Sequence, residues 1–189
     1  MSNGAPALPA FPHLHTSRCV LREIDDNDLE AMYLGLSDAQ VIRYYGVAYD
    51  SLKATREQMQ WYAQLRAEGR GLWWGIALAD QPQALIGACG LYEYSRRHRR
   101  AELGYWLSPE HWGQGLMSEC VGGVLAYGFE AMVLHRIEAV VEPDNLASIA
   151  LLERHKFVRE GVRRECERRA GQYLSLISYG LLQPEWAGR

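Results

Sequence analysis

Two glycines placed one residue apart, Gly113 and Gly115, lie between a strand-like stretch that ends at Leu107 and a helix-like stretch that begins at Leu116. A loop with so little side-chain bulk leaves the backbone N–H groups at the start of the helix open to a ligand. These donors and the positive end of the helix dipole favour an anion. The sequence therefore predicts a phosphate-binding loop at this position.

Three interpretations of this loop compete. A Walker loop requires a lysine directly after its last glycine, and this sequence has none there. The dinucleotide fingerprint fits better, since Gly113, Gly115 and Ser118 occupy G-x-G-x-x-S, and Glu142 ends the next strand. Against it, residues 108–112 separate the strand from the first glycine, and the chain upstream predicts an antiparallel meander. The third interpretation is a tight turn that merely requires glycine.

Composition limits the kinds of partner. A chain of 189 residues predicts a single domain, and its formal net charge of −3 gives no general attraction to nucleic acid or to an anionic membrane. The four cysteines form no Cys-x-x-Cys and no His/Cys pattern at metal spacing, so we expect reduced thiols and no metal site. The sequence shows neither a signal-like segment nor a long apolar run, which predicts a cytoplasmic protein.

Hydrophobic periodicity predicts the elements that position the loop. Residues 1–16, with three prolines, are expected to be a loose tail, and residues 17–186 the folded domain. Strands are expected at 17–24, 72–80, 84–94, 101–107, 136–142, 158–167 and 172–182. Helices are expected at 25–36, 51–68, 116–132 and 143–157. This order predicts an α+β fold with one mixed sheet.

Five stretches in a fixed order resemble a known family: TSRCVLREIDDNDLEAM, LIGACGLY, AELGYWLSPEHWGQGLMSE, NLASIALLERHKFVREG and LLQPEW. From Thr16 to Trp186 the sequence resembles the GNAT superfamily of acyl-CoA-dependent N-acyltransferases, and within it the RimJ/RimL-type ribosomal-protein N-terminal acetyltransferases. The resemblance implies acetyl-CoA as co-substrate, an amine acceptor and a homodimer as a possible assembly. It also implies a mostly antiparallel sheet with helices on both faces and a splay between two parallel central strands.

The resemblance also assigns cofactor contacts by position. It implies that the strand residues Tyr105, Trp106 and Leu107 face the pantetheine and acetyl group through their backbone. Asn145 matches the family's cofactor-contacting Asn, and Ser148 matches a hydroxyl that lies near the sulfur. The implied pyrophosphate loop consists of Gly113, Gln114, Gly115, Leu116, Met117 and Ser118.

Acetyl transfer to an amine requires a group that accepts a proton from the amine and a group that supports the departing thiolate. Glu102 is the first candidate for the base, acting through water, although a strand glutamate can equally be solvated or paired with a neighbouring arginine. Glu110 is the second candidate. Ser148 is the candidate proton donor, with an exposed position near a helix cap as its alternative. Tyr105 and Tyr179 are further possible donors.

The acceptor is predicted from amine chemistry. An α-amino group with a pKa of about 7.8 is roughly a third neutral at pH near 7.5, whereas a lysine side chain is neutral in only about one molecule in a thousand. Together with the resemblance, this predicts the N-terminal α-amine of a protein, of the ribosomal type and with a small first residue, that enters past the first seventy residues and the turn between the last two strands. Arginines in the turn at 163–169 are expected to repel a polyamine. A small-molecule amine and a non-catalytic CoA-binding module are the alternatives.

Overall fold

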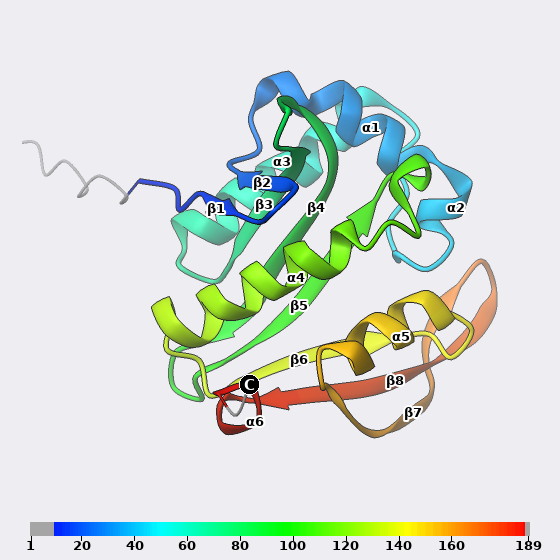
Figure 1. Cartoon of the computed structure of the whole chain (residues 1–189). Helices are drawn as coiled ribbons and strands as arrows, with labels where there is room; N and C mark the ends of the chain where they lie inside the picture. Colours follow the sequence, from blue (N-terminus) through cyan, green and yellow to red (C-terminus); the bar gives the residue numbers. More distant parts are fainter. Residues whose placement is uncertain (1–9, 188–189) are drawn as a thin grey trace, which may run out of the picture.

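The computed structural model describes residues 10–187, which form one sheet in the strand order β1-β2-β3-β4-β5-β6-β8-β7 (Figure 1). Its strands are β1 (Leu14–His15), β2 (Cys19–Arg22), β3 (Leu72–Leu78), β4 (Gln81–Ser95), β5 (Arg100–Leu107), β6 (Arg136–Val141), β7 (Val158–Arg169) and β8 (Gln172–Leu182). Neighbouring strands are antiparallel except for β5 and β6. The predicted α+β fold with a mixed, mostly antiparallel sheet is confirmed.

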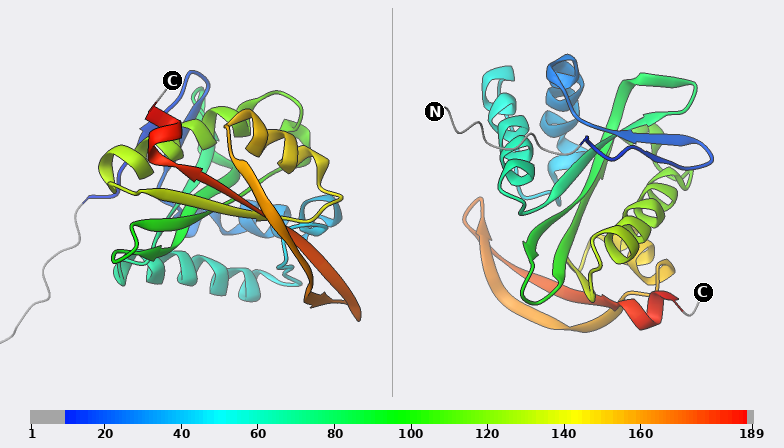
Figure 2. Two further views of the ribbon diagram at one scale, coloured as in Figure 1. Left: turned by 90° about the horizontal axis from the view of Figure 1, so that it is seen from below. Right: turned by 90° about the vertical axis from the view of Figure 1, so that its left-hand side faces the viewer.

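Helices cover both faces of this sheet (Figure 2). Along the chain they are the 3-10 turn η1 (Asp26–Asp28), α1 (Leu29–Ser37), α2 (Ala39–Ile42), α3 (Leu52–Ala67), the 3-10 turn η2 (Pro109–His111), α4 (Leu116–Ala126), the π-helical turn η3 (Tyr127–Ala131), α5 (Leu146–Arg154) and α6 (Gln183–Ala187). Helices α1 and α3 lie on one face, and α4 and α5 lie on the other (Figure 2).

Each face has its own apolar core, because a sheet in this arrangement must bury side chains on both sides. The core under α1 and α3 includes Met32, Leu36, Tyr62, Leu65, Trp73 and Trp106. The core under α4 and α5 includes Leu103, Cys120, Val124, Leu125, Ile137 and Leu152. Successive residues of β5 point to opposite faces, so this strand contributes to both cores.

Capping residues determine where the predicted helices start. The hydroxyl of Ser51 accepts the N–H of Ala54 at 3.3 Å, and α3 then spans Leu52–Ala67, within one residue of the predicted limits at both ends. The predicted helix 25–36 begins instead as the turn η1, in which Asp25 and Asp28 form a reciprocal capping box. The predicted helix 116–132 loses its regular hydrogen bonding after Ala126 and ends in η3.

Several short elements were not predicted, because two to five residues are too few to show a period. They are β1, α2 and α6. Residues 1–9 of the expected tail lie outside the described residues. The rest of that segment contacts the domain, since β1 pairs with β2 and the indole Nε1 of Trp74 donates to the carbonyl of Pro12 at 2.7 Å.

The sequence predicted a turn for the arginines at 163–169. The structure places them in the long strand β7 instead. This strand continues to Arg169, and the turn to β8 is formed by Ala170 and Gly171, which both have positive φ angles of 47° and 84°. Cross-strand pairing with β8 decided the length of β7, and that pairing cannot be read from the local run of charges.

Gly35 in α1 is expected not to tolerate alanine. A Cβ atom at Gly35 would lie 2.1 Å from Cζ3 of Trp106, whose indole is buried. Overpacking costs about 1–3 kcal/mol, which exceeds the roughly 1 kcal/mol that alanine gains over glycine within a helix. Urea unfolding of Gly35→Ala should therefore show a net loss of about 1–2 kcal/mol in the free energy of unfolding.

The matched control is Gly123→Ala in α4, where the nearest atom to a new Cβ is Cγ2 of Thr16 at 3.8 Å. This variant should be neutral or up to about 1 kcal/mol more stable than the wild type. An equal loss of stability in both variants would contradict the argument from Trp106.

Candidate active site

The two central parallel strands separate partway along their length. Their register covers three residue pairs and ends where Glu102 of β5 lies opposite Glu138 of β6. Strand β5 continues to Leu107 in register with β4, and β6 continues to Val141 in register with β8. The facing edges beyond the last pair border a cleft of about 1330 Å³. The predicted splay is therefore present, and it exposes backbone donors and acceptors to any ligand in the cleft.

The glycine loop lies at this cleft and ends in a helix start without a side-chain cap. Gly113 and Gly115 have φ angles of 72° and 79°, in the left-handed region that favours glycine. Gly115 is the N-cap of α4, and no side chain bonds to the first turn, so its N–H groups are available to an anion. Arg18 braces the loop from outside by donating to the carbonyl of Gln114 at 2.9 Å and pairing with Glu119 at 2.5 Å.

The cleft brings together all the predicted site residues except Gln114, whose side chain donates to the backbone carbonyl of Glu110 at 3.0 Å. Glu110, the second candidate for the base, also does not line the cleft. The same holds for Tyr179, a further candidate donor, which is buried and donates to Glu153 at 3.3 Å. The predicted residues that line it are Glu102, Tyr105, Trp106, Leu107, Gly113, Gly115, Leu116, Met117, Ser118, Asn145 and Ser148.

Two hydroxyl groups meet on the α5 side of the cleft. Asn145 caps α5, its Oδ1 accepting the N–H of Ser148 at 3.2 Å, and this cap fixes Ser148 in the first turn. Burial raises the pKa of Tyr105, and a hydrogen bond with Ser148 opposes this only in part. Tyr105 therefore stays protonated at neutral pH, and the Ser148–Tyr105 pair can supply a proton.

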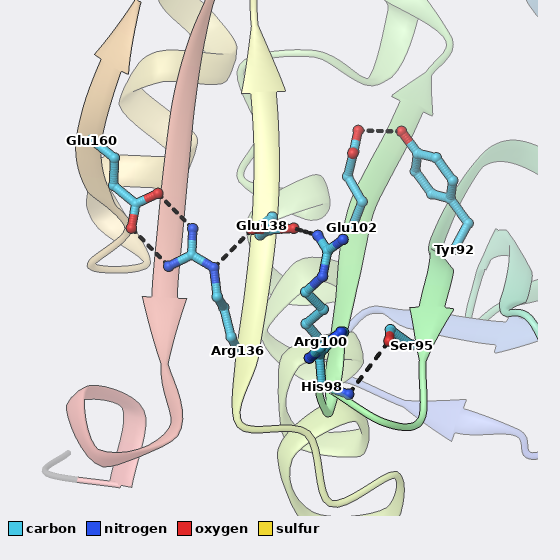
Figure 3. A network of polar contacts seen from close by, with 8 residues as sticks. All are labelled: Tyr92, Ser95, His98, Arg100, Glu102, Arg136, Glu138 and Glu160. Carbon is cyan, nitrogen blue, oxygen red and sulfur yellow. Dashed lines mark hydrogen bonds and ion pairs between the residues drawn. The ribbon is translucent and has the colours of Figure 1, made fainter.

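Glu102 approaches the cleft from the opposite face of the sheet. It lies an odd number of residues from Tyr105 on β5, and its carboxylate accepts a hydrogen bond from Tyr92 of β4 (Figure 3). Burial is the main cause that raises the pKa of Glu102, with further contributions from the charges of Glu138 and Glu93. A carboxyl whose pKa is moved toward neutrality is suited to general-base chemistry.

Aromatic side chains form the wall beside Glu102. Trp61 and Trp73 both border the cleft. The wall also includes three tyrosines from the segment around α2, which are Tyr44, Tyr45 and Tyr49. The signal for them was the tyrosine-rich stretch RYYGVAYD, which carries no periodicity that would assign it to an element.

The hairpin of β7 and β8 closes one end of the cleft. Arg169 pairs with Glu142 at the end of β6 at 2.6 Å and donates to the backbone carbonyl of Arg43 at 2.8 Å. Glu142, the acidic residue of the dinucleotide interpretation, is therefore engaged by an arginine, and the antiparallel sheet excludes a doubly wound fold.

Within the described residues 10–187 there is no cluster of three or more His, Cys, Asp and Glu side chains that could hold a metal ion. The helices of this part of the chain also lack the length and apolar character of a membrane span.

Comparison with known proteins identifies the family. Residues 18–158 match the acetyltransferase (GNAT) domain. The uncharacterized N-acetyltransferase YoaA of Bacillus subtilis is 41% identical over 175 residues, which cover 92% of this chain and 98% of that protein. The chain belongs to the GNAT acetyltransferase family, and its co-substrate is acetyl-CoA.

Solved structures agree with this assignment but differ in acceptor. Spermidine N-acetyltransferase from Vibrio cholerae, in complex with CoA and spermine, is 26% identical with a TM-score of 0.80, covering 90% of this chain and 99% of that chain. RimL, a ribosomal L7/L12 alpha-N-protein acetyltransferase in complex with coenzyme A, has a TM-score of 0.79 over 90% of this chain and 98% of that chain. Its sequence identity is 22%, so this likeness supports the fold alone.

Substitution of Gly115 is expected to weaken CoA binding. Gly115 has a φ of 79°, and a new Cβ would make a van der Waals contact without a clash, since its nearest atom would be a guanidinium nitrogen of Arg18 at 3.5 Å. In Gly115→Leu the side chain would cover the N–H groups of the first turn of α4, and each lost bond to a charged group costs about 1.5–3 kcal/mol. Calorimetric titration should show at least about tenfold weaker binding of CoA.

Gly69→Leu is the matched control, since Gly69 has a φ of 63°, has no atom within 4 Å of a new Cβ and does not line the cleft. Both variants should lose comparable stability from backbone strain, but only Gly115→Leu should lose affinity for CoA. Equal affinity in the two variants would show that the loop does not hold the pyrophosphate.

Proposed function

We propose that this enzyme is of the RimJ/RimL type and transfers the acetyl group of acetyl-CoA to the N-terminal α-amine of a protein. The observation that carries the mechanism is the splay of β5 and β6, which places a candidate base and a candidate acid on opposite sides of one cleft. The pKa of an α-amine supports this acceptor, because a large fraction is neutral without a strong base. Such an acceptor places the enzyme in the cytoplasm, and a homodimer stays a prediction.

In this proposal different residues of the cleft bind the cofactor, accept the amine proton and protonate the thiolate. The loop at residues 113–118 and Asn145 hold the cofactor, and the free edge of β5 aligns its extended arm. The neutral amine attacks the thioester carbonyl, and Glu102 accepts the amine proton, directly or through one water. The C–S bond then breaks, and the Ser148–Tyr105 pair protonates the departing thiolate, which leaves CoA as a neutral thiol.

A small-molecule amine such as a polyamine is the second candidate, favoured by the composition of the cleft. Its acidic lining residues Glu57, Glu102, Glu142 and Glu167 are matched in number by Arg43, Arg154, Arg163 and Arg169. The arginines therefore do not make the cleft cationic, so the expected repulsion of a polyamine loses its basis. Aromatic rings beside carboxylates also attract ammonium groups, and one solved relative is a spermidine N-acetyltransferase.

The role of Glu102 can be tested by pH dependence. Because burial raises the pKa of Glu102, the wild-type kcat/KM should fall as the pH decreases through that raised value, where the carboxyl becomes protonated. The acceptor amine ionises as well, so the slope of log(kcat/KM) at low pH should be about two for the wild type and one for Glu102→Gln. Glu102→Gln should also lower kcat about 100-fold.

Ser148→Ala is the control for this measurement. It should lower kcat but keep the low-pH slope of the wild type, since it removes a proton donor and leaves the base intact. A Glu102→Gln enzyme with an unchanged slope and a nearly unchanged kcat would show that Glu102 is not the base.

The acceptor can be tested in cells and with the purified enzyme. Mass spectrometry of protein N-termini, with and without the gene, should show one or a few proteins that lose their N-terminal acetyl group. Peptides with those N-termini should be acetylated with at least about tenfold higher kcat/KM than spermidine. Unchanged N-termini together with efficient acetylation of spermidine would favour the polyamine and leave the acetyl-transfer chemistry in place.

A further inference from the structure

The carboxylate of Glu102 is held by one tyrosine from the neighbouring strand. Tyr92 of β4 lies directly opposite Glu102 in the antiparallel register with β5, and its hydroxyl donates to Oε1 (Figure 3). The ring of Tyr92 packs against Trp73 and Trp61, with centroid distances of 6.0 and 6.1 Å. Aromatic packing therefore fixes the ring, and the ring fixes where the hydroxyl points.

The charged groups around Glu102 come from every strand next to it. On the β6 side, Glu138 is the nearest acidic neighbour, and Arg100 and Arg136 both engage it, Arg136 at 2.8 Å (Figure 3). Arg136 also pairs with Glu160 of β7 at 2.5 Å. Glu93 of β4 and Arg163 of β7 act on Glu102 with opposite signs.

Within residues 10–187, Glu102 forms no ion pair with these arginines. The two that reach the β5–β6 boundary, Arg100 and Arg136, are committed to Glu138 and Glu160. Within the described residues, the one hydrogen bond to the carboxylate of Glu102 comes from Tyr92, and it engages Oε1. Oε2 accepts no hydrogen bond from the described residues, and Glu102 lines the cleft.

We propose that Tyr92 is a positioning residue for acetyl transfer, which holds Glu102 with Oε2 toward the acceptor and stabilises its ionised form through the bond to Oε1. This inference rests on the proposed role of Glu102 as the base. A half-buried carboxylate without an ion-paired cation among the described residues needs such a donor, because burial disfavours the charged form.

The tyrosine can act as donor over the whole working range of the enzyme. Burial, and after it the charge of Glu102, raises the pKa of Tyr92, so its hydroxyl stays protonated. A donor to the ionised carboxylate lowers the pKa of Glu102, and this opposes the effect of burial. Removal of the hydroxyl should therefore raise the pKa of Glu102 further.

The test is the pH profile of kcat/KM for the wild type, Tyr92→Phe, Glu102→Gln and the double variant, measured with acetyl-CoA and the best amine acceptor. Phenylalanine keeps the ring contacts with Trp61 and Trp73 and removes only the hydroxyl. We expect the carboxyl ionisation in Tyr92→Phe to move upward by about one pH unit. Below that ionisation kcat/KM should fall roughly tenfold, and well above it only the smaller loss caused by poorer positioning of Glu102 should remain.

Tyr49→Phe is the matched control, because Tyr49 lines the same wall but donates to Oε1 of Gln58 at 2.5 Å. It should leave the carboxyl ionisation at its wild-type pH. In the Glu102→Gln background, adding Tyr92→Phe should cause no further pH-dependent loss, since the group that the tyrosine acts on is absent.

Two outcomes would overturn the proposal, and they are distinguishable. If Tyr92→Phe leaves both the carboxyl ionisation and kcat/KM at their wild-type values while Glu102→Gln removes that ionisation, the base assignment stands and the hydroxyl of Tyr92 does not act on Glu102. If Glu102→Gln retains the wild-type profile, Glu102 is not the base, and the role of Tyr92 is overturned with it.

Discussion

Strands β5 and β6 are hydrogen-bonded over three residue pairs and then separate, although each continues in the sheet with its other neighbour. Backbone N–H and C=O groups on the facing edges lose their partners beyond this point, and buried polar groups require new ones. An extended ligand with amides of its own can supply them. The glycine loop follows β5 after the turn η2, and α5 follows β6, so both helix starts lie at the mouth of this opening.

The separation also decides how the chemistry is arranged. Because side chains alternate along a strand, β5 presents Glu102 to the aromatic side of the sheet and Tyr105 to the side of α4 and α5. In an unbroken sheet these two groups would be separated by the sheet itself. Burial raises the pKa of both, but the effect differs in kind, since it makes the carboxyl a better base and keeps the phenol protonated.

Ion pairs surround the part of β5 and β6 that remains hydrogen-bonded. Consecutive ion pairs connect β5, β6 and β7 through Arg100, Glu138, Arg136 and Glu160 (Figure 3). Arg136 also passes over Gly180 of β8, where a Cβ atom would lie 2.6 Å from the guanidinium of Arg136. These pairs are partly exposed, so each contributes little to stability alone. Their consequence for the site is that Arg100 and Arg136 pair with Glu138, the acidic neighbour of Glu102, and not with Glu102 itself.

The sequence by itself determined the features that local chemistry controls. The glycine loop at Gly113 and Gly115, the helix start after it and the cap at Asn145 depend on residues within one turn of chain, and these were predicted. Tertiary structure alone decided which distant groups meet. The partner of Glu102, the tyrosines around α2, the extension of β7 and the contact of Arg169 with Glu142 all depend on strand register and packing between segments far apart in sequence. Register and packing are properties of the whole sheet, so no local pattern of residue types could specify them.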